Sequence, residues 1–350
     1  MLGVQGGDFL EKSPPGRRRQ LRIMIKVSII MPCYNEGKFI GRAIESLLDD
    51  YVIEQGEILV VDGLSSDNTA AIVTGYIKQN FPVKLLKNEK KLQCFGLNQG
   101  ILAARGEIIV RVDAHSFYPG GYVRRLVELL EQTGAANVGG VMLPKGESPV
   151  QEAVALALQH PIGVGDAKFH LGNYKGYVDT VYLGAFPKVI FDTVGLYDTN
   201  CRTNEDAELN IRILKNNGKI YLDSTIQVEY LPRDSFGKLA VQYFHYGRGR
   251  AYTTVKHRQV TSYRQVAPSL LVIGLLGSLL LSFFNPLFLI FWGCYLLALL
   301  SVVLFTWCKR NISLKIRLLM GIAFAVMHTS WGFGFLSYFI IPKLRKHEKK

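Results

Sequence analysis

The stretch that decides the fold is VSIIMPCYNEG, residues 27–37. Its first five residues are apolar except for Ser28, as in a strand that is covered on both faces, and Pro32 ends the strand. The polar residues Asn35 and Glu36 follow, just before a helical pattern whose free N–H groups and dipole favour an anionic ligand. Taken alone, this stretch is a generic strand-to-helix turn.

The same alternation of strand and helix continues to about Tyr230. Strands are predicted at 27–31, 58–61, 83–87 and 108–112, and helices at 39–48, 67–78, 95–104 and 121–131. Near-continuous apolar strands separated by helices predict a parallel sheet with both faces covered. Function in such sheets collects at the C-terminal ends of the strands, where the polar clusters of this chain lie.

Two of these clusters follow strands directly. Asp62 is followed by Gly63 and a Ser/Asp/Thr cap, so its carboxylate can accept from a base N–H or a ribose hydroxyl; a capped turn is the alternative. Asp113 and His115 point the same way in an extended segment. One oxygen and one imidazole ligand suit Mn²⁺ or Mg²⁺ that is held mainly by a diphosphate.

A pair of acids opens the helical pattern 204–214. Glu205 and Asp206 face different directions, because neighbours on a helix are about 100° apart. One of them can therefore face the cleft as a general base while the other pairs elsewhere. Acids placed on the helix dipole are the alternative interpretation.

The positive charge is concentrated in the last third of the chain. The net charge is +13, yet residues 230–350 carry 16 Lys and Arg against two acids. This charge lies beside apolar stretches, which indicates an anionic membrane surface as the partner. No element that reads or stacks on bases accompanies it, so nucleic acid is not predicted as a partner. The five cysteines show no paired spacing, which predicts free thiols in a reducing cytosol.

The domain plan follows from composition. Residues 1–23 are predicted to be a disordered tail and 24–232 a catalytic domain. A basic, aromatic segment at 233–266 either lies on the bilayer surface or packs on the catalytic domain. The region 267–342 is predicted to hold membrane-spanning helices at 268–284, 287–307 and 318–341, before a basic tail at 343–350.

The orientation of these helices is left open. The basic residues at 309–317 and those of the tail should both be cytoplasmic. Both can be so only if the third apolar segment enters and leaves on one side, and His328, Gly332 and Gly334 would suit a re-entrant break. Three plain spans are the other arrangement.

Together these patterns resemble the family 2 glycosyltransferases with the GT-A fold, from about Val27 to Arg250. The resemblance rests on Pro32-x-Tyr34-Asn35-Glu36, Val61-Asp62-Gly63 with Ser66-Asp67-x-Thr69, Asn98 through Ala104-Arg105-Gly106, Asp113-x-His115 and Glu205-Asp206. The chain is most similar to the exopolysaccharide glucosyltransferases of the succinoglycan type, which also show Asp-Ala-His and a C-terminal membrane anchor. The resemblance implies a mixed, mostly parallel sheet flanked by helices, followed by transmembrane helices.

The resemblance also implies roles for single positions. Asp206 would be the catalytic base, and Asp113 and His115 would hold Mn²⁺ or Mg²⁺. The nucleotide-sugar, with its uracil edge on Asp62, would be bound by Pro32, Tyr34, Glu36, Asp62, Lys91, Asn98 and Asp113. The acceptor and diphosphate region would contain Gly184, Phe186, Glu205, Gln242, His245 and Tyr246.

The implied activity is an inverting transfer of a hexose. The donor would be a UDP-sugar, in particular UDP-glucose, and the acceptor a polyprenyl-diphosphate-linked saccharide at the cytoplasmic face of a cell inner membrane. The processive members carry Gln-x-x-Arg-Trp, whereas this chain has only Gln242-Tyr243-Phe244-His245-Tyr246, which argues against processive synthesis. A processive synthase and a GT-A-like nucleotidyltransferase are the alternatives.

Overall fold

The computed structural model describes residues 25–260, 262–305 and 312–341. The predictions for the tails at 1–23 and 343–350, and for Cys308, Lys309 and Arg310, lie outside this part of the chain.

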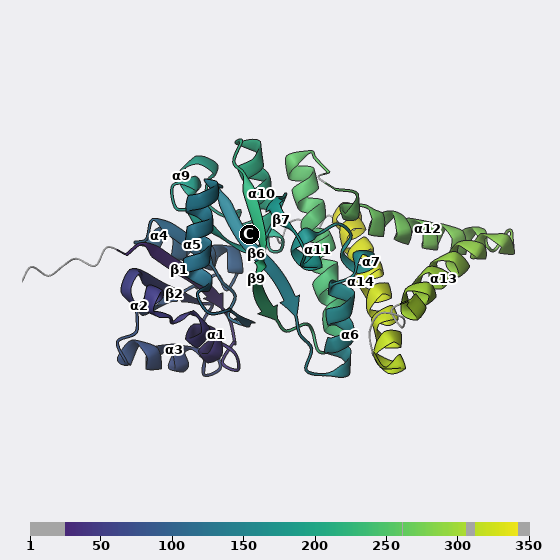
Figure 1. The fold of residues 1–350 in the computed structure, drawn as a ribbon. Helices are drawn as coiled ribbons and strands as arrows, with labels where there is room; N and C mark the ends of the chain where they lie inside the picture. The colour runs from purple at the N-terminus through teal and green to yellow at the C-terminus, as the bar shows by residue number, and fades with distance from the viewer. Residues whose placement is uncertain (1–24, 261, 306–311, 342–350) are drawn as a thin grey trace, which may run out of the picture.

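A mixed sheet forms the centre of the molecule (Figure 1). Within the described residues the strands are β1 (Val27–Cys33), β2 (Gly56–Asp62), β3 (Val83–Lys87), β4 (Ile108–Arg111), β5 (Ser116–Phe117), β6 (Asn137–Pro144), β7 (Lys175–Tyr177), β8 (Tyr182–Pro187) and β9 (Ile220–Tyr230). The order is β3-β2-β1-β4-β8-β6-β9-β5, and β7 pairs with β9. The first four strands of this order are parallel, as predicted, whereas β8 is antiparallel to both β4 and β6.

Helices cover both faces of the sheet. The helices of the catalytic domain are α1 (Ile40–Leu47), α2 (Asp50–Gln55), α3 (Thr69–Lys78), α4 (Gln93–Ala103), α5 (Tyr122–Thr133), α6 (Pro149–Leu158), α7 (Pro161–Val164), α8 (Lys168–Leu171), α9 (Ile190–Val194) and α10 (Glu205–Lys215). The side chains of β1 alternate between two cores: Ile29 and Met31 lie in one with α1, α3 and α5, and Ile30 lies in the other with α4, α9 and α10. The predicted strands and helices of the first 133 residues agree with the structure to within two residues at each end.

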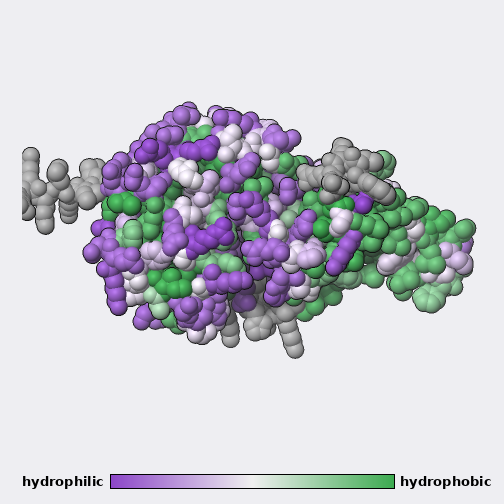
Figure 2. All heavy atoms as spheres, turned by 60° about the horizontal axis from the view of Figure 1, so that its bottom comes forward, coloured by the Kyte–Doolittle hydropathy of each residue, from purple (hydrophilic) through white to green (hydrophobic). Residues whose placement is uncertain are grey.

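The C-terminal helices extend from one side of this domain (Figure 1). They are α11 (Phe236–His257), η1 (Tyr263–Gln265), α12 (Ala267–Leu281), η2 (Pro286–Leu289), α13 (Ile290–Phe305) and α14 (Leu314–Ile340). In the described residues, Pro286–Phe305 and Leu314–Ile340 are long and apolar enough to cross a membrane, whereas α12 has 15 residues. Figure 2 shows a mostly hydrophobic surface over the projecting end of the molecule, interrupted by more polar residues near its tip.

The basic, aromatic segment packs on protein along α11. Thr203 Oγ1 donates to the His245 carbonyl at 2.9 Å, and Asn204 Nδ2 donates to the Tyr246 carbonyl at 2.8 Å. Its other side packs against α14. Of the two placements predicted for this segment, the structure therefore shows packing against the catalytic domain.

Close contact between α11 and α14 depends on glycine. A Cβ on Gly334 would collide with the Phe244 carbonyl, and one on Gly247 would collide with the Trp331 carbonyl. The helix α14 continues without interruption through Gly332 and Gly334. These glycines therefore serve helix packing, and the structure does not contain the re-entrant break that the sequence allowed there.

Gly334→Ala should lower the stability of the purified protein. The added methyl group meets backbone rather than a flexible side chain, so the two helices must separate, which costs about 1–3 kcal/mol. Thermal unfolding in detergent, followed by tryptophan fluorescence, would report the loss as a lower melting temperature. Gly237→Ala in α11 is the matched control because open space surrounds that position, and an equal shift in both variants would contradict the packing argument.

Candidate functional site

The ends of β1 and β2 are joined into one structured edge. Asn35 N donates to Ser65 Oγ and its Oδ1 accepts from Ser66 N, both at 2.8 Å. Glu36 N donates to Thr69 Oγ1 at 2.9 Å. The left-handed backbone of Asn35, with φ of 56°, allows this turn. The two loops therefore hold each other in place around the strand ends.

Asp62 is a buried part of this edge. It is 5% exposed, and its carboxylate accepts from Ser65 N at 3.2 Å and from the Ser65 hydroxyl. This is the capped turn that the sequence allowed as an alternative. A contact with a uracil edge stays a prediction.

The other residues predicted to bind nucleotide differ in exposure. Tyr34 is 48% exposed, and Lys91 Nζ lies 5.7 Å from the centre of its ring, so both present an open surface. Pro32 is half-buried within β1. Asn98 donates to the Tyr197 carbonyl at 2.8 Å and accepts from Tyr197 N at 2.9 Å. In this structure Asn98 braces α4 against the Tyr197 backbone, and its contact with base or ribose stays a prediction.

His115 pairs with Glu36 at the centre of the edge. Its Nδ1 lies 3.0 Å from Glu36 Oε1. Burial disfavours the charged ring, but the hydrogen bond that the ring donates to Glu36 and the charge of Asp113 raise the pKa of His115 overall. Glu36, predicted to frame the nucleotide, thus orients the imidazole, as carboxylates commonly do for metal-binding histidines.

The donor atoms at this edge suit a divalent ion that is shared with a ligand. No group of three or more His, Cys, Asp or Glu side chains converges in the described part of the chain. Asp113 is half-buried, with Oδ1 3.2 Å from Gln93 Nε2, and His115 keeps Nε2 on the side away from Glu36. Two protein ligands are what Mg²⁺ or Mn²⁺ needs when phosphate oxygens and water complete its shell. Asp113 and His115 would hold such an ion.

Arg111 links Asp113 to Glu205, the residue that precedes the predicted base Asp206. It is buried, with NH2 2.8 Å from Glu205 Oε1 and 3.9 Å from Asp113 Oδ1. No role for Arg111 was predicted, although it lies two residues before Asp113 on the same face of an extended segment. The two-residue repeat of side chains along an extended strand is the signal in the sequence that could have indicated a role for Arg111.

Glu205 and Asp206 have separate environments, as predicted for neighbours on a helix. Glu205 is buried against Arg111, and burial raises its pKa to about 7 although Arg111 opposes this shift. Asp206 is half-buried and its Oδ1 accepts from Ala207 N at 2.7 Å. Asp206 therefore remains the more accessible of the two acids.

The raised pKa of Glu205 gives stability a pH dependence of defined sign. Between its usual pKa of 4.5 and about 7, the folded chain binds this proton more tightly than the unfolded chain does. The free energy of unfolding should therefore fall as pH rises through this window, by on the order of 1–3 kcal/mol.

Glu205→Gln should lack this contribution. Its melting temperature relative to the unmodified protein should rise between pH 5 and pH 8, by about 2–4 °C for each kcal/mol. Exposed Glu152→Gln on α6 is the control. A difference that does not change with pH would show that Glu205 does not titrate there.

Three of the residues predicted for the acceptor region lie near one another on α11, and their part in binding an acceptor stays a prediction. Gln242 Nε2 donates to the hydroxyls of Tyr246, at 2.9 Å, and Tyr230, at 3.2 Å. The Tyr230 ring lies 6.2 Å from the His115 ring, so α11 reaches the metal side of the site. His245 is exposed beside this group.

The structure corrects the role that was predicted for Phe186. Phe186 was predicted to form the floor of the sugar site, but it is 2% exposed and packs against Phe191 in the core, so it cannot touch a bound sugar. Gly184 pairs with Arg111 across β4 and β8, and its φ of 138° together with the nearby Asn137 side chain excludes a larger residue.

Comparison with known proteins agrees with this geometry. Residues 28–194 match the family model described as Glycosyl transferase family 2. Succinoglycan biosynthesis protein ExoA of Rhizobium meliloti is 32% identical over 309 residues, which cover 88% of this chain and 93% of that one. The chain belongs to glycosyltransferase family 2.

Two further proteins show how far this family 2 glycosyltransferase resembles others. A dolichyl N-acetyl-alpha-D-glucosaminyl phosphate 3-beta-D-2,3-diacetamido-2,3-dideoxy-beta-D-glucuronosyltransferase of Methanococcus voltae is 30% identical, over 64% of this chain and 72% of that one. The mannosyltransferase PcManGT from Pyrobaculum calidifontis, solved in complex with GDP-Man and Mn²⁺, has a TM-score of 0.57 and 18% identity, covering 90% and 87% of the two chains. The solved structure confirms the predicted GT-A fold.

Proposed function

We propose that this family 2 glycosyltransferase moves a hexose from a UDP-sugar, UDP-glucose in particular, to a saccharide carried on a polyprenyl diphosphate, with inversion at the anomeric carbon. The observation that carries the proposal is the line of contacts from Asp113 through Arg111 to Glu205, with His115 two residues after Asp113 and Asp206 next to Glu205. This line connects a place for the donor diphosphate with a carboxylate free to take a proton. Action in exopolysaccharide or lipid-linked glycan synthesis is supported by the relatives.

Each side chain has a defined part in this reaction. Tyr34 and Lys91 present the open surface against which the base would lie. Asp113 and His115 would hold a divalent ion, which supplies positive charge to the departing diphosphate. Arg111 keeps Asp113 in position and stays charged, because Glu205 and Asp113 raise its pKa although burial opposes this.

Asp206 completes the reaction as the general base. It would take the acceptor proton while the acceptor oxygen attacks the anomeric carbon from the face opposite the diphosphate. The acceptor oxygen forms the new glycosidic bond as the bond from sugar to diphosphate breaks, so a single displacement inverts the configuration. The buried pair of Arg111 with Glu205 fixes the start of α10 and with it the position of Asp206.

The acceptor assignment is supported by the apolar helices. The hydrophobic projection next to the catalytic domain would attach the enzyme to the cytoplasmic face of a cell inner membrane (Figure 2). An enzyme and an acceptor that share one membrane meet at a raised effective concentration. The name of the Methanococcus relative describes an acceptor carried on dolichyl phosphate, which is also a polyprenyl lipid but has one phosphate instead of two.

The donor and acceptor can be tested together. Membranes that contain the protein would be incubated with a panel of labelled UDP-sugars and with labelled GDP-mannose, and the organic-soluble fraction would be counted. We expect label from UDP-glucose in the lipid fraction, released by mild acid, and the opposite anomeric configuration in the released product by NMR. Membranes with Asp206→Asn are the control. Label only from another donor would overturn the sugar assignment, and label only in water-soluble product would overturn the lipid acceptor.

A further inference from the structure

The turn at the tip of the α12–α13 hairpin satisfies its own N–H groups. The acceptors lie within the hairpin, and the pairs are Ser282 N to Ser278 O, Phe283 N to Leu280 O, Phe284 N to Leu281 O, Asn285 N to Leu281 O, Leu287 N to Asn285 Oδ1 and Phe288 N to Asn285 O, at 3.0–3.4 Å. The remaining residue of the turn, Pro286, has no N–H. Such a turn does not need water as an acceptor.

The side chains of the hairpin suit hydrocarbon as well. Phe283 and Phe284 at the tip are 84% and 88% exposed, which is unfavourable in water. Several polar side chains bond to their own hairpin: the Ser278 and Ser282 hydroxyls donate to carbonyls three residues back, and Trp292 Nε1 donates to the Leu275 carbonyl at 3.0 Å. The tip is therefore built to lie inside a bilayer rather than to emerge from it.

The length of α12 leads to the same conclusion. Fifteen residues at 1.5 Å each extend about 22 Å, whereas the hydrocarbon core is about 30 Å thick. A hairpin with one arm of this length and an apolar tip reaches into the bilayer without crossing it.

The helix α14 is long enough to cross a membrane but is held against the catalytic domain. His328, near its middle, has Nε2 2.7 Å from the carbonyl of Ile162 on α7. In the apolar 18-residue stretch of α14, 44% is buried inside the protein. In the corresponding stretch of Pro286–Phe305, only 11% is buried. If α14 crossed the membrane, α6, α7 and α11 would have to enter the hydrocarbon with it.

The exposed large apolar residues of α14 lie on one side of the helix, toward its two ends. They are Leu314, Leu318 and Ile322 in the first part and Phe333, Phe339 and Ile340 in the last, and the charged Lys315 is exposed beside the first of them. One side of the helix thus packs on protein and the other presents hydrocarbon side chains, as in helices that lie in the plane of a membrane interface.

We propose that the α12–α13 hairpin enters the bilayer and returns to the side from which it entered, and that α14 lies along the same membrane surface. The described residues outside the hairpin then stay on the side of the catalytic domain. This inference rests on the proposed membrane attachment and replaces the three predicted spans. It also places the basic residues at 309–317 and at 343–350 on one side, which the positive-inside rule requires and three spans cannot provide.

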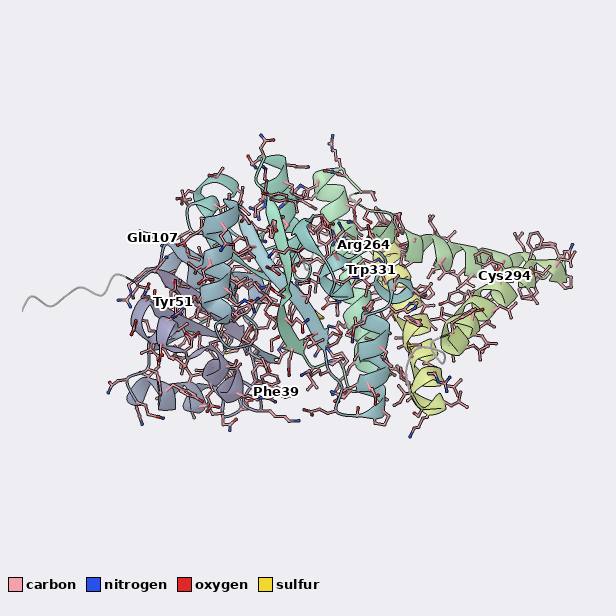
Figure 3. The ribbon with its side chains drawn as sticks, in the orientation of Figure 1. Phe39, Tyr51, Glu107, Arg264, Cys294 and Trp331 are labelled. Atoms are coloured by element: carbon pink, nitrogen blue, oxygen red, sulfur yellow. The ribbon has the colours of Figure 1, made fainter. Side chains whose placement is uncertain are left out.

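Cysteine labelling with a membrane-impermeant maleimide tests the inference on the full chain. Sealed spheroplasts and inverted vesicles would carry Phe284→Cys or Leu287→Cys at the tip, Ser313→Cys before α14, or a cysteine appended after Lys350. Each variant is compared with the unmodified protein, whose Cys294 lies on α13 far from the catalytic domain (Figure 3). Retained transfer activity shows that each variant is folded.

We expect Ser313→Cys and the appended cysteine to react only from the side of the catalytic domain. The tip cysteines should react from neither side until detergent is added. Tip labelling from either side of intact membranes, or opposite sidedness of Ser313→Cys and the appended cysteine, would overturn the inference. Washing the membranes with alkaline carbonate tests membrane attachment separately from the topology of the hairpin. Release of the protein into the supernatant would contradict membrane attachment itself.

Discussion

Replacing Asp206 by asparagine should lower turnover by roughly 10²–10⁴ while leaving donor affinity near normal. Asparagine keeps the shape and the hydrogen bond from Ala207 N, because its carbonyl oxygen can accept as the carboxylate does. It removes only the capacity to take the acceptor proton. Turnover would be measured by transfer to the lipid acceptor, and donor binding by calorimetry with UDP-sugar and Mn²⁺.

Glu205→Gln is the matched comparison for Asp206→Asn. Glu205 is buried against Arg111, so its replacement should weaken folding more than it slows the chemistry of the folded enzyme. Turnover per folded molecule should therefore fall clearly less than for Asp206→Asn. If Asp206→Asn kept near-normal turnover, or lost donor binding in proportion to rate, Asp206 would be a binding or capping residue and another group would be the base.

Asp113→Ala should abolish transfer and weaken Mn²⁺ binding in the presence of UDP. Alanine removes both carboxylate oxygens and also leaves Gln93 and Arg111 without this partner. His115→Asp should retain activity and shift the preference toward Mg²⁺, because a carboxylate is a harder ligand than imidazole. Excess chelator should stop the unmodified enzyme.

The control for these substitutions is Asp192→Ala. Asp192 is exposed on α9, in a pocket with Glu107 at the start of β4, the opposite end of that strand from Asp113. The Asp192→Ala variant should keep both its metal binding and its transfer activity unchanged. Calorimetric titration of Mn²⁺ into the enzyme with UDP separates metal loss from loss of turnover. Full activity in excess chelator, or unchanged Mn²⁺ binding in Asp113→Ala, would contradict the metal role.

The first half of the sheet could be predicted because its signals are local. Apolar runs such as that from Val27 to Met31 are continuous and separated by stretches with a helical pattern. The second half could not, because β8 reverses direction and β6 contains an irregularity at Gly139 and Gly140, where the pairing register shifts. Those features depend on contacts distant in sequence, which leave no local pattern.

Some features of the candidate site could likewise be predicted from local sequence, and others could not. The common direction of Asp113 and His115 and the divergence of Glu205 from Asp206 follow from the periods of strand and helix. The pairing of Glu36 with His115 joins residues 79 positions apart, and no pattern announces it. Phe186 was misplaced because the resemblance supplied a role without stating which side of β8 faces the core.

The packing of α14 on α6 and α11 has a consequence for folding. Phe324 and Met327 of α14 share one core with Leu158 of α6 and Leu239 of α11. The apolar helix α14 is thus part of a core that it shares with α6 and α11, and cutting it away would expose that core. By mass action, a bilayer that binds only the native chain stabilises it as any ligand does. Lipid composition should therefore tune the melting temperature of the enzyme as well as its position in the cell.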